Sequence, residues 1–318
     1  MNKVLMLLSV SAFSLTASAD PKIIYGDDNR VDVYASTNPE FVKLSKSTAA
    51  MISNSKMSKS ILGLNFKLDP ATLTQKMRAC SDERFASQPA VARCSGFLIS
   101  DKLLVTAGHC MRKPFLDPKT GKMVDDCKNN SWVFDYKMDS ETEINLNKSA
   151  STVYKCNKII SRELNDQTLN DYALIELDRA VTDREPLKFR KRGKIKSGSE
   201  IVVIGHPSGL PTKITDDAQV KDLKKNYFTA NLDTYGGNSG SAVFNVSTGE
   251  VEGILVRGDT DYKYRYRGMT LTAEDMYYLT SLMPVDPKEI CMESNKVSHD
   301  KAGESVTYIT NIKEIKNL

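Results

Sequence analysis

The chain has 318 residues, of which 40% are hydrophobic, and its net charge is +4. This length excludes a single small barrel and fits two compact lobes with insertions. The charge balance by itself argues neither for nor against nucleic acid. However, no Lys/Arg run is interleaved with aromatic residues, so we expect no nucleic-acid partner.

The N-terminus has the features of a secretory signal peptide. Lys3 precedes an apolar stretch at 4–15, and the residues at 17–19 form an A-x-A cleavage pattern. We therefore expect a signal peptide at 1–19, cleaved before Asp20, although a buried N-terminal helix is the alternative. The apolar stretch is too short to cross a bilayer, and no later stretch is apolar enough. We expect a secreted or periplasmic protein with no membrane contact.

Short apolar runs recur along most of the chain. Residues 20–43 are a polar N-terminal arm, and an insertion that ends near Cys80 follows the first expected strand. Many short strands between Gly, Pro and Asn turns are typical of an all-β barrel or sandwich. The strands are expected at 48–52, 95–100, 102–106, 132–136, 152–160, 172–177, 200–204, 227–232, 241–244, 251–256 and 306–310.

The charged segment 182–196 is a plausible bridge between two β-barrels. We therefore assign a first barrel to 44–185 and a second barrel to 186–318. The second contains a long polar insertion at 259–302, before the last strand. A structureless loop of that length would be unusual inside a compact domain.

A helix is expected in this insertion near 273–282, with Thr272 as its N-cap and two acidic residues directly after it. The insertion also contains five tyrosines. They could line an extended substrate groove, but packing at its rim is the more common role of such amphipathic side chains.

Three short segments contain a serine, a histidine and an aspartate in settings that are typical of catalytic residues. Ser239 lies among small residues, and the glycine at 237 allows backbone N–H groups to converge beside it, as an oxyanion hole requires. His109 follows an apolar run, and Asp171 begins another. The order His, Asp, Ser differs from that of α/β-hydrolases. Position 241 is serine where the nucleophile turn of those hydrolases has glycine.

Other candidates for these roles are weaker. The chain has three histidines. His206 lies in a turn, where a structural or rim position is expected, and His299 has the surroundings of a surface loop. Asp166 is the rival acid, but Asp171 directly precedes the apolar run.

Four motifs resemble those of chymotrypsin-fold serine peptidases, in particular the bacterial V8-like, glutamyl-endopeptidase-like branch. The similarity covers roughly residues 23–256 and the last dozen residues. The motifs are Cys94-Ser95-Gly96-Phe97-Leu98-Ile99, Thr106-Ala107-Gly108-His109-Cys110, Asp171-Tyr172-Ala173-Leu174-Ile175 and Gly237-Asn238-Ser239-Gly240-Ser241, with a similar loop at Ile204-Gly205-His206-Pro207-Ser208-Gly209. The resemblance implies two six-stranded antiparallel β-barrels, a short C-terminal helix and an active site in the cleft between the barrels.

The resemblance also implies roles for these residues. His109 would act as general base and then general acid, Asp171 would orient it, and Ser239 would be the nucleophile. The N–H groups of Gly237 and Ser239 would form the oxyanion hole.

Six cysteines in an exported chain imply disulfides. Cysteines matching Cys94 and Cys110 are bonded in the resembled family. The other four allow three connectivities, of which we favour Cys127–Cys156 and Cys80–Cys291. No CxxC pair and no Cys/His cluster has zinc spacing, so we expect no metal and no cofactor.

The substrate preference follows from the resemblance less directly. Asp233, six residues before Ser239, matches the pocket base where trypsin-like enzymes bind Arg or Lys. Thr234 and Gly258 are expected beside it, and Glu304 adds negative charge if the register allows. Glutamyl enzymes instead carry a histidine on the pocket-wall strand, which is absent at 253–258. Arg257 would neutralise Asp233 if it entered the pocket, although a solvent-facing position is favoured.

We therefore expect a monomeric secreted serine endopeptidase that cleaves proteins or peptides after Arg or Lys. One alternative is a glutamyl endopeptidase that cuts after Glu or Asp. Another is a catalytically silent binding protein on the same scaffold.

Overall fold

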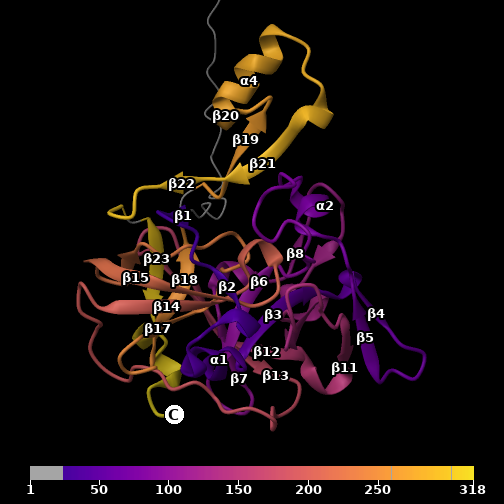
Figure 1. The fold of residues 1–318 in the computed structure, drawn as a ribbon. Coiled ribbons are helices and arrows are strands. Elements are labelled where there is room, and N and C mark those ends of the chain that lie inside the picture. The colour runs from indigo at the N-terminus through magenta and orange to yellow at the C-terminus, as the bar shows by residue number, and fades with distance from the viewer. Residues whose placement is uncertain (1–23, 259, 302) are drawn as a thin grey trace, which may run out of the picture.

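The computed structural model describes residues 24–258, 260–301 and 303–318. The expected signal peptide at 1–19 lies outside the described residues. The main elements of the described chain are short strands that are organised around two barrels, and an inserted unit extends from one end (Figure 1). No helix among the described residues has both the length and the apolar character needed to cross a bilayer.

The first barrel is closed, with the strand order β10-β12-β13-β7-β6-β3. All neighbouring strands are antiparallel. Its interior contains large apolar side chains that include Leu104, Trp132 and Phe134. The strands are β3 (Thr48–Ser53), β6 (Cys94–Leu98), β7 (Leu103–Thr106), β10 (Asn130–Phe134), β12 (Val153–Asn165) and β13 (Asn170–Leu177).

The second barrel has the order β14-β17-β18-β23-β16-β15 and closes through a β14–β15 pairing. The short strand β2 (Val31–Asp32), from the N-terminal arm, adds to its β15 edge. Two closed six-stranded antiparallel barrels confirm the predicted fold class. The strands are β14 (Glu200–Gly205), β15 (Lys213–Leu223), β16 (Tyr227–Ala230), β17 (Ala242–Asn245), β18 (Val251–Arg257) and β23 (Glu304–Tyr308).

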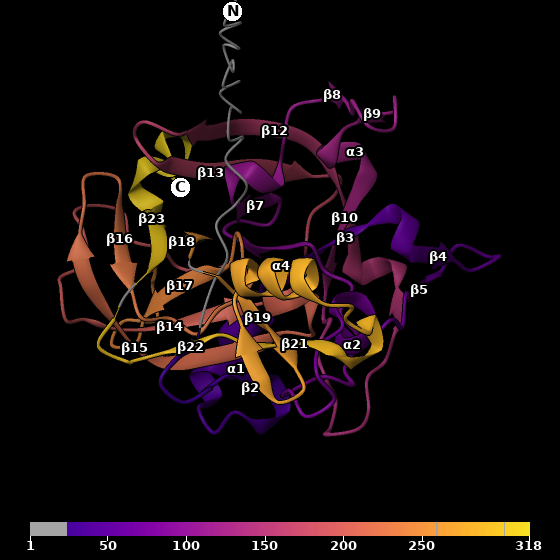
Figure 2. The same cartoon turned by 90° about the horizontal axis from the view of Figure 1, so that it is seen from above.

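The insertion before β23 forms its own small unit. Strands β19 (Tyr262–Tyr266), β20 (Met269–Leu271) and β21 (Ile290–Ser294) pair in the order β20-β19-β21. Helix α4 (Ala273–Leu282) has the predicted bounds, and Thr272 caps it through a capping box. Seen from above, α4 projects over the middle of the molecule (Figure 2).

Smaller elements complete the chain. Strand β1 (Ile24–Tyr25) pairs in parallel with β22 (Lys296–Val297), which joins the N-terminal arm to the end of the insertion. The expected C-terminal helix takes the form of two short 3-10 turns, at Ile309–Asn311 and Lys313–Ile315. The remaining elements are α1 (Pro39–Ser45), α2 (Leu73–Met77), α3 (Asp126–Asn129), β4 (Met57–Lys59), β5 (Asn65–Leu68), β8 (Phe115–Leu116), β9 (Met123–Val124) and β11 (Asn147–Ser149).

Candidate active site

His109 lies in a tight 3-10 turn, Gly108–Cys110, that follows strand β7 of the first barrel. A Cβ atom at Gly108 would lie 2.0 Å from the carbonyl oxygen of Glu163 and 2.8 Å from that of Tyr172. Only glycine therefore allows this turn to approach β12 and β13 so closely. The approach brings the imidazole of His109 against Asp171 of β13.

Two hydrogen bonds join His109 to Asp171. The imidazole Nδ1 lies 2.8 Å from Asp171 Oδ2, and the backbone N–H of His109 donates to Asp171 Oδ1 at 3.1 Å. Burial acts to raise the pKa of Asp171, but the hydrogen bonds from His109 and the charges of His109 and Arg257 outweigh it and lower the pKa. An ionised carboxylate here favours a proton on Nδ1 and leaves Nε2 as the proton acceptor.

Arg257, the last residue of β18, reaches the same carboxylate from the second barrel. Its Nη1 lies 3.8 Å from Asp171 Oδ2, and its Nη2 donates to the carbonyl oxygen of Leu169 at 2.5 Å. The sequence analysis placed this side chain either in solvent or in the specificity pocket, but it occupies neither position. A cation beside Asp171 stabilises the carboxylate and opposes the formation of a positive charge on His109.

Ser239 lies in the loop between β16 and β17, which requires glycine at two positions. Gly237 and Gly240 have φ values of +102° and +90°, a region that other residues rarely adopt. Among the residues that the structure describes, the backbone N–H groups of Gly237 and Ser239 have no acceptor. Two converging N–H groups without an acceptor are what an oxyanion hole requires.

A cavity of about 570 Å³ joins the two halves of the site. His109, Ser239 and Gly237 all face it. Among the described residues, no hydrogen bond joins Ser239 Oγ to the imidazole of His109. Such contacts often tighten only when substrate binds. The lining residues are Met51, Arg93, Cys94, His109, Cys110, Arg112, Asp126, Leu164, Gly236, Gly237 and Ser239.

Three disulfides are present, and they are the three pairs favoured in the sequence analysis: Cys94–Cys110, Cys127–Cys156 and Cys80–Cys291. The first joins β6 to the turn that carries His109. The sulfur atoms of Cys94 and Cys110 lie within 4.8 Å of a His109 ring nitrogen, but they are bonded to each other and therefore offer no thiolate ligands.

Asp233 faces a partner that the sequence analysis did not anticipate. The analysis expected its carboxylate to meet a substrate side chain. Instead, its oxygens accept hydrogen bonds from the backbone N–H groups of Tyr25 (2.6 Å) and Asn29 (3.2 Å), both in the N-terminal arm. The residue is 1% exposed. Burial raises the pKa of Asp233 to about 6, although the two backbone hydrogen bonds act to lower it.

Thr234 and Gly258, the other expected pocket residues, meet at Glu304. The hydroxyl of Thr234 donates to Glu304 Oε2. A Cβ atom at Gly258 would lie 2.1 Å from Glu304 Oε1, so the carboxylate lies directly against the Gly258 backbone. The acid beside these two residues is therefore Glu304, at the start of β23, and Asp233 is turned away to the arm.

Ser95 is a site residue that the sequence analysis did not single out. Its hydroxyl donates to the carbonyl oxygen of Gly237 at 2.8 Å and accepts from the backbone N–H of His206 at 3.0 Å. Its own N–H donates to the carbonyl oxygen of Ser239 at 2.8 Å. Ser95 thus links the first barrel to the loop of Ser239. In the sequence, the position of Ser95 directly after Cys94 could have indicated that it lies close to the candidate site.

His206 lies in the core behind this loop. Its ring stacks on Tyr136 at a centroid distance of 5.6 Å, and its Nδ1 lies 3.1 Å from the carbonyl oxygen of Leu210. Burial lowers the pKa of His206 to about 3. The imidazole is therefore neutral at physiological pH, and its role is to support the turn at Pro207–Gly209.

Two antiparallel six-stranded barrels thus bring a His–Asp pair and a glycine-rich serine loop to one cavity. Residues 94–254 match the profile of the trypsin-like peptidase domain, and the chain belongs to that family. No curated protein matches the chain at a significant level. One similar solved structure is described as "Structure of Glu endopeptidase in complex with MPD". Its sequence is 14% identical, the match covers 82% of this chain and 99% of that one, and the TM-score is 0.44.

Proposed function

We propose that the protein is an exported serine endopeptidase in which His109, Asp171 and Ser239 form the catalytic triad. The observation that carries the proposal is the 2.8 Å contact between His109 Nδ1 and Asp171 Oδ2, at a cavity that Ser239 also lines. The three disulfides agree with an oxidising compartment.

In this mechanism His109 Nε2 takes the proton of Ser239 as the hydroxyl attacks the scissile carbonyl. Asp171 stabilises the imidazolium that forms, and the N–H groups of Gly237 and Ser239 bind the developing oxyanion. His109 then gives its proton to the leaving amine. Water then attacks the resulting acyl-enzyme. His109 takes a proton from this water and gives it to Ser239 as the acyl group leaves.

The triad is tested with Ser239→Ala, which removes the nucleophilic hydroxyl and leaves the rest of the side chain in place. We expect peptide hydrolysis to fall by several orders of magnitude, while the melting temperature stays within a few degrees. A fluorophosphonate probe should label the wild type and fail to label the variant. Ser197→Ala, a serine on the loop before β14, is the matched control and should be labelled normally.

Residual hydrolysis by Ser239→Ala within about tenfold of the wild type would contradict the triad assignment. A wild type that resists the probe and cleaves no peptide would instead favour a binding protein on a peptidase scaffold.

We further propose that cleavage follows Arg or Lys, and that Glu304 supplies the negative charge of the specificity pocket. The support is its contact with Thr234 and with the backbone of Gly258. A carboxylate in a buried pocket disfavours acidic and apolar side chains and favours a cation that can pair with it. Arg257 contacts Leu169 and Asp171, so its positive charge does not neutralise Glu304.

A peptide-library cleavage profile tests this preference. Glu304→Gln keeps the size of the side chain and removes its charge. It should lower kcat/KM for Arg and Lys substrates by tenfold or more, the scale of a lost charge-assisted hydrogen bond, about 1.5–3 kcal/mol. Asp233→Asn should leave the preference in place, and Glu293→Gln in the insertion is the control. If the wild type cuts mainly after Glu or Asp, the assignment is wrong.

A further inference from the structure

The insertion contacts the loop that precedes Ser239. The backbone N–H of Gly236 donates to Asp261 Oδ2 at 2.8 Å, just before strand β19. The ring of Tyr262 packs on that of Tyr235 at a centroid distance of 4.9 Å. Tyr235 is fully buried, and the Arg30 guanidinium lies 4.3 Å from its centroid. Segments from outside the barrel thus enclose the start of this loop.

Tyr262 also reaches the loop through Ser208. The two hydroxyl oxygens are 2.6 Å apart, and both residues are buried. The backbone N–H of Ser208 donates to the carbonyl oxygen of Gly236 at 2.6 Å. Ser208 has a φ of +54°, a left-handed conformation that needs support from its surroundings.

This contact sets the direction of an oxyanion donor. The carbonyl of Gly236 and the N–H of Gly237 belong to one trans peptide plane and point in opposite directions. Because Ser208 holds the carbonyl on one side, the Gly237 N–H is directed to the other side. Gly237 lines the cavity that His109 and Ser239 share. Rotation of this plane would replace the N–H donor with a carbonyl oxygen, which repels an oxyanion.

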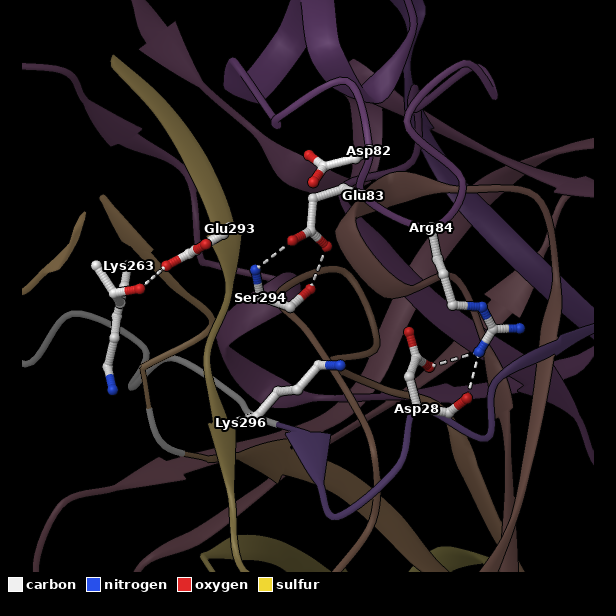
Figure 3. Close-up of a pocket in the computed structure, with 9 residues that line it drawn as sticks. Asp28, Asp82, Glu83, Arg84, Lys263, Glu293, Ser294 and Lys296 are labelled. Carbon is white, nitrogen blue, oxygen red and sulfur yellow. Dashed lines mark hydrogen bonds and ion pairs between the residues drawn. The ribbon is translucent and has the colours of Figure 1, made fainter. Parts of the chain in front are cut away.

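The insertion is itself fixed to the first lobe. The Cys80–Cys291 disulfide joins it to the loop before β6, and Glu83 accepts hydrogen bonds from the N–H and hydroxyl of Ser294. A charged cavity of about 440 Å³ lies at this junction, where acids and bases from the insertion, the 82–84 loop and the arm face one another (Figure 3). Arg265 pairs with Asp82 beside it. The insertion can therefore act as a firm support.

We propose that the insertion positions the oxyanion hole, with Tyr262 acting through Ser208 and Asp261 acting on Gly236. This inference rests on the proposed function, since an oxyanion hole has a role only in catalysis. Asp261 and Tyr262 are positioning residues: they support the Gly236–Gly237 peptide plane and touch no reacting atom.

The test uses Tyr262→Phe, which removes the hydroxyl and keeps the ring on Tyr235, together with Asp261→Ala and Asp261→Asn. Tyr262→Phe and Asp261→Ala should each lower kcat by about three- to tenfold, the size of one lost hydrogen bond, and leave KM within about twofold. A peptide boronate, which forms a tetrahedral adduct with serine, should bind more weakly by the same factor as kcat falls. Asp261→Asn keeps an acceptor for Gly236 and should restore most of the activity.

Active-site titration with a fluorophosphonate, together with melting temperatures, separates positioning from folding. A lower fraction of active protein with normal kcat per titrated site would overturn the proposal, as would normal boronate affinity in both variants. Tyr277→Phe, on an exposed face of α4 in the same insertion, should behave as the wild type. A wild type that neither reacts with the probe nor cleaves peptides would refute the proposed function itself, which is a separate result.

Discussion

The two halves of the candidate active site are held in different ways. In the first barrel, His109 and Asp171 contact each other directly, through one side-chain and one backbone hydrogen bond. In the second barrel, the loop of Ser239 has to present backbone N–H groups. Three residues from other segments hydrogen-bond to this loop: Ser95 from the first barrel, Ser208 from the turn behind the loop and Asp261 from the insertion. A side-chain pair can be fixed locally, whereas a backbone orientation needs support from several segments.

The largest loss of activity is expected when the hydrogen bond between the side chains of His109 and Asp171 is changed. Asp171→Asn would place an amide N–H against His109 Nδ1, which favours the tautomer whose Nε2 already carries a proton. We expect kcat to fall by about four orders of magnitude with little change in melting temperature. Asp166→Asn, five residues upstream and exposed, is the matched control and should be fully active. Activity of Asp171→Asn close to that of the control would show that another acid orients His109.

A smaller but still large effect is expected in the serine loop. In Gly237→Ala, the new Cβ would lie 2.5 Å from the carbonyl oxygen of His206, at a backbone φ of +102°. The loop must shift, so we expect kcat to fall by about 100- to 1,000-fold, as for a lost oxyanion donor. Gly193→Ala also has a positive φ, but its Cβ meets no atom within 4 Å. Gly193→Ala should therefore lower only the melting temperature. Equal losses of kcat in the two variants would show that the contact of the new Cβ with His206 does not cause the loss in Gly237→Ala.

The contribution of His206, which lies behind the serine loop, to the free energy of unfolding should decrease at acidic pH. The unfolded chain protonates His206 near pH 6.5, whereas the folded chain does so only near pH 3. The stability that comes from neutral His206 is therefore complete above pH 6.5 and is lost as the pH falls towards 3. At pH 4 this loss amounts to about 3 kcal/mol of unfolding free energy.

His206→Phe should retain the stacking on Tyr136 and lose this titration. Between pH 7 and pH 4, denaturant unfolding should then show a smaller drop in stability for the variant than for the wild type. His299→Gln, at an exposed position, is the control and should keep the wild-type slope. Parallel pH profiles for the wild type and His206→Phe would mean that His206 takes up its proton in the folded state without cost.

The smallest effect is expected at Arg257, which links the two halves. Arg257→Gln can still donate to the carbonyl oxygen of Leu169, but it no longer places a positive charge 3.8 Å from Asp171. The positive charge that develops on His109 in the transition state is then opposed less, so kcat/KM should rise by about two- to threefold. Arg162, which donates to the carbonyl oxygen of Gly108, stays in place. Arg257→Lys should keep the wild-type kcat/KM, and an unchanged kcat/KM in Arg257→Gln would exclude a charge effect.

The sequence predicted the parts of this molecule that depend on short-range pattern. Apolar runs between turn residues identified all of the barrel strands except one, and the N-cap at Thr272 identified α4 with its bounds. Strand β15 was missed, because acidic and basic residues alternate with its few apolar ones. The three strands of the insertion were missed for a similar reason, since β19 consists of alternating tyrosine and basic residues.

Within the candidate site, the sequence does not indicate the contacts that join distant segments. The partners of Asp233 lie more than 200 residues away in the arm, and no local pattern indicates them. Glu304 meets Thr234 only because β23 pairs beside β16 and β18. Arg257 could not be placed from sequence, since its direction depends on the bulge at the end of the β18–β23 pairing. Motifs identified the candidate residues His109, Asp171 and Ser239, and topology determined which residues surround them.

The hydrogen bonds between the arm and Asp233 also bear on how the protein can be shortened. A recombinant version that began at Val31 would lack Tyr25 and Asn29, so the carboxylate of Asp233 would lose both donors from the arm. A hydrogen bond to a charged group contributes about 1.5–3 kcal/mol, and strand β1 would be lost as well. A shortened version should therefore retain Ile24 onward. An affinity tag belongs at the other end of the chain, where Leu318 is half exposed.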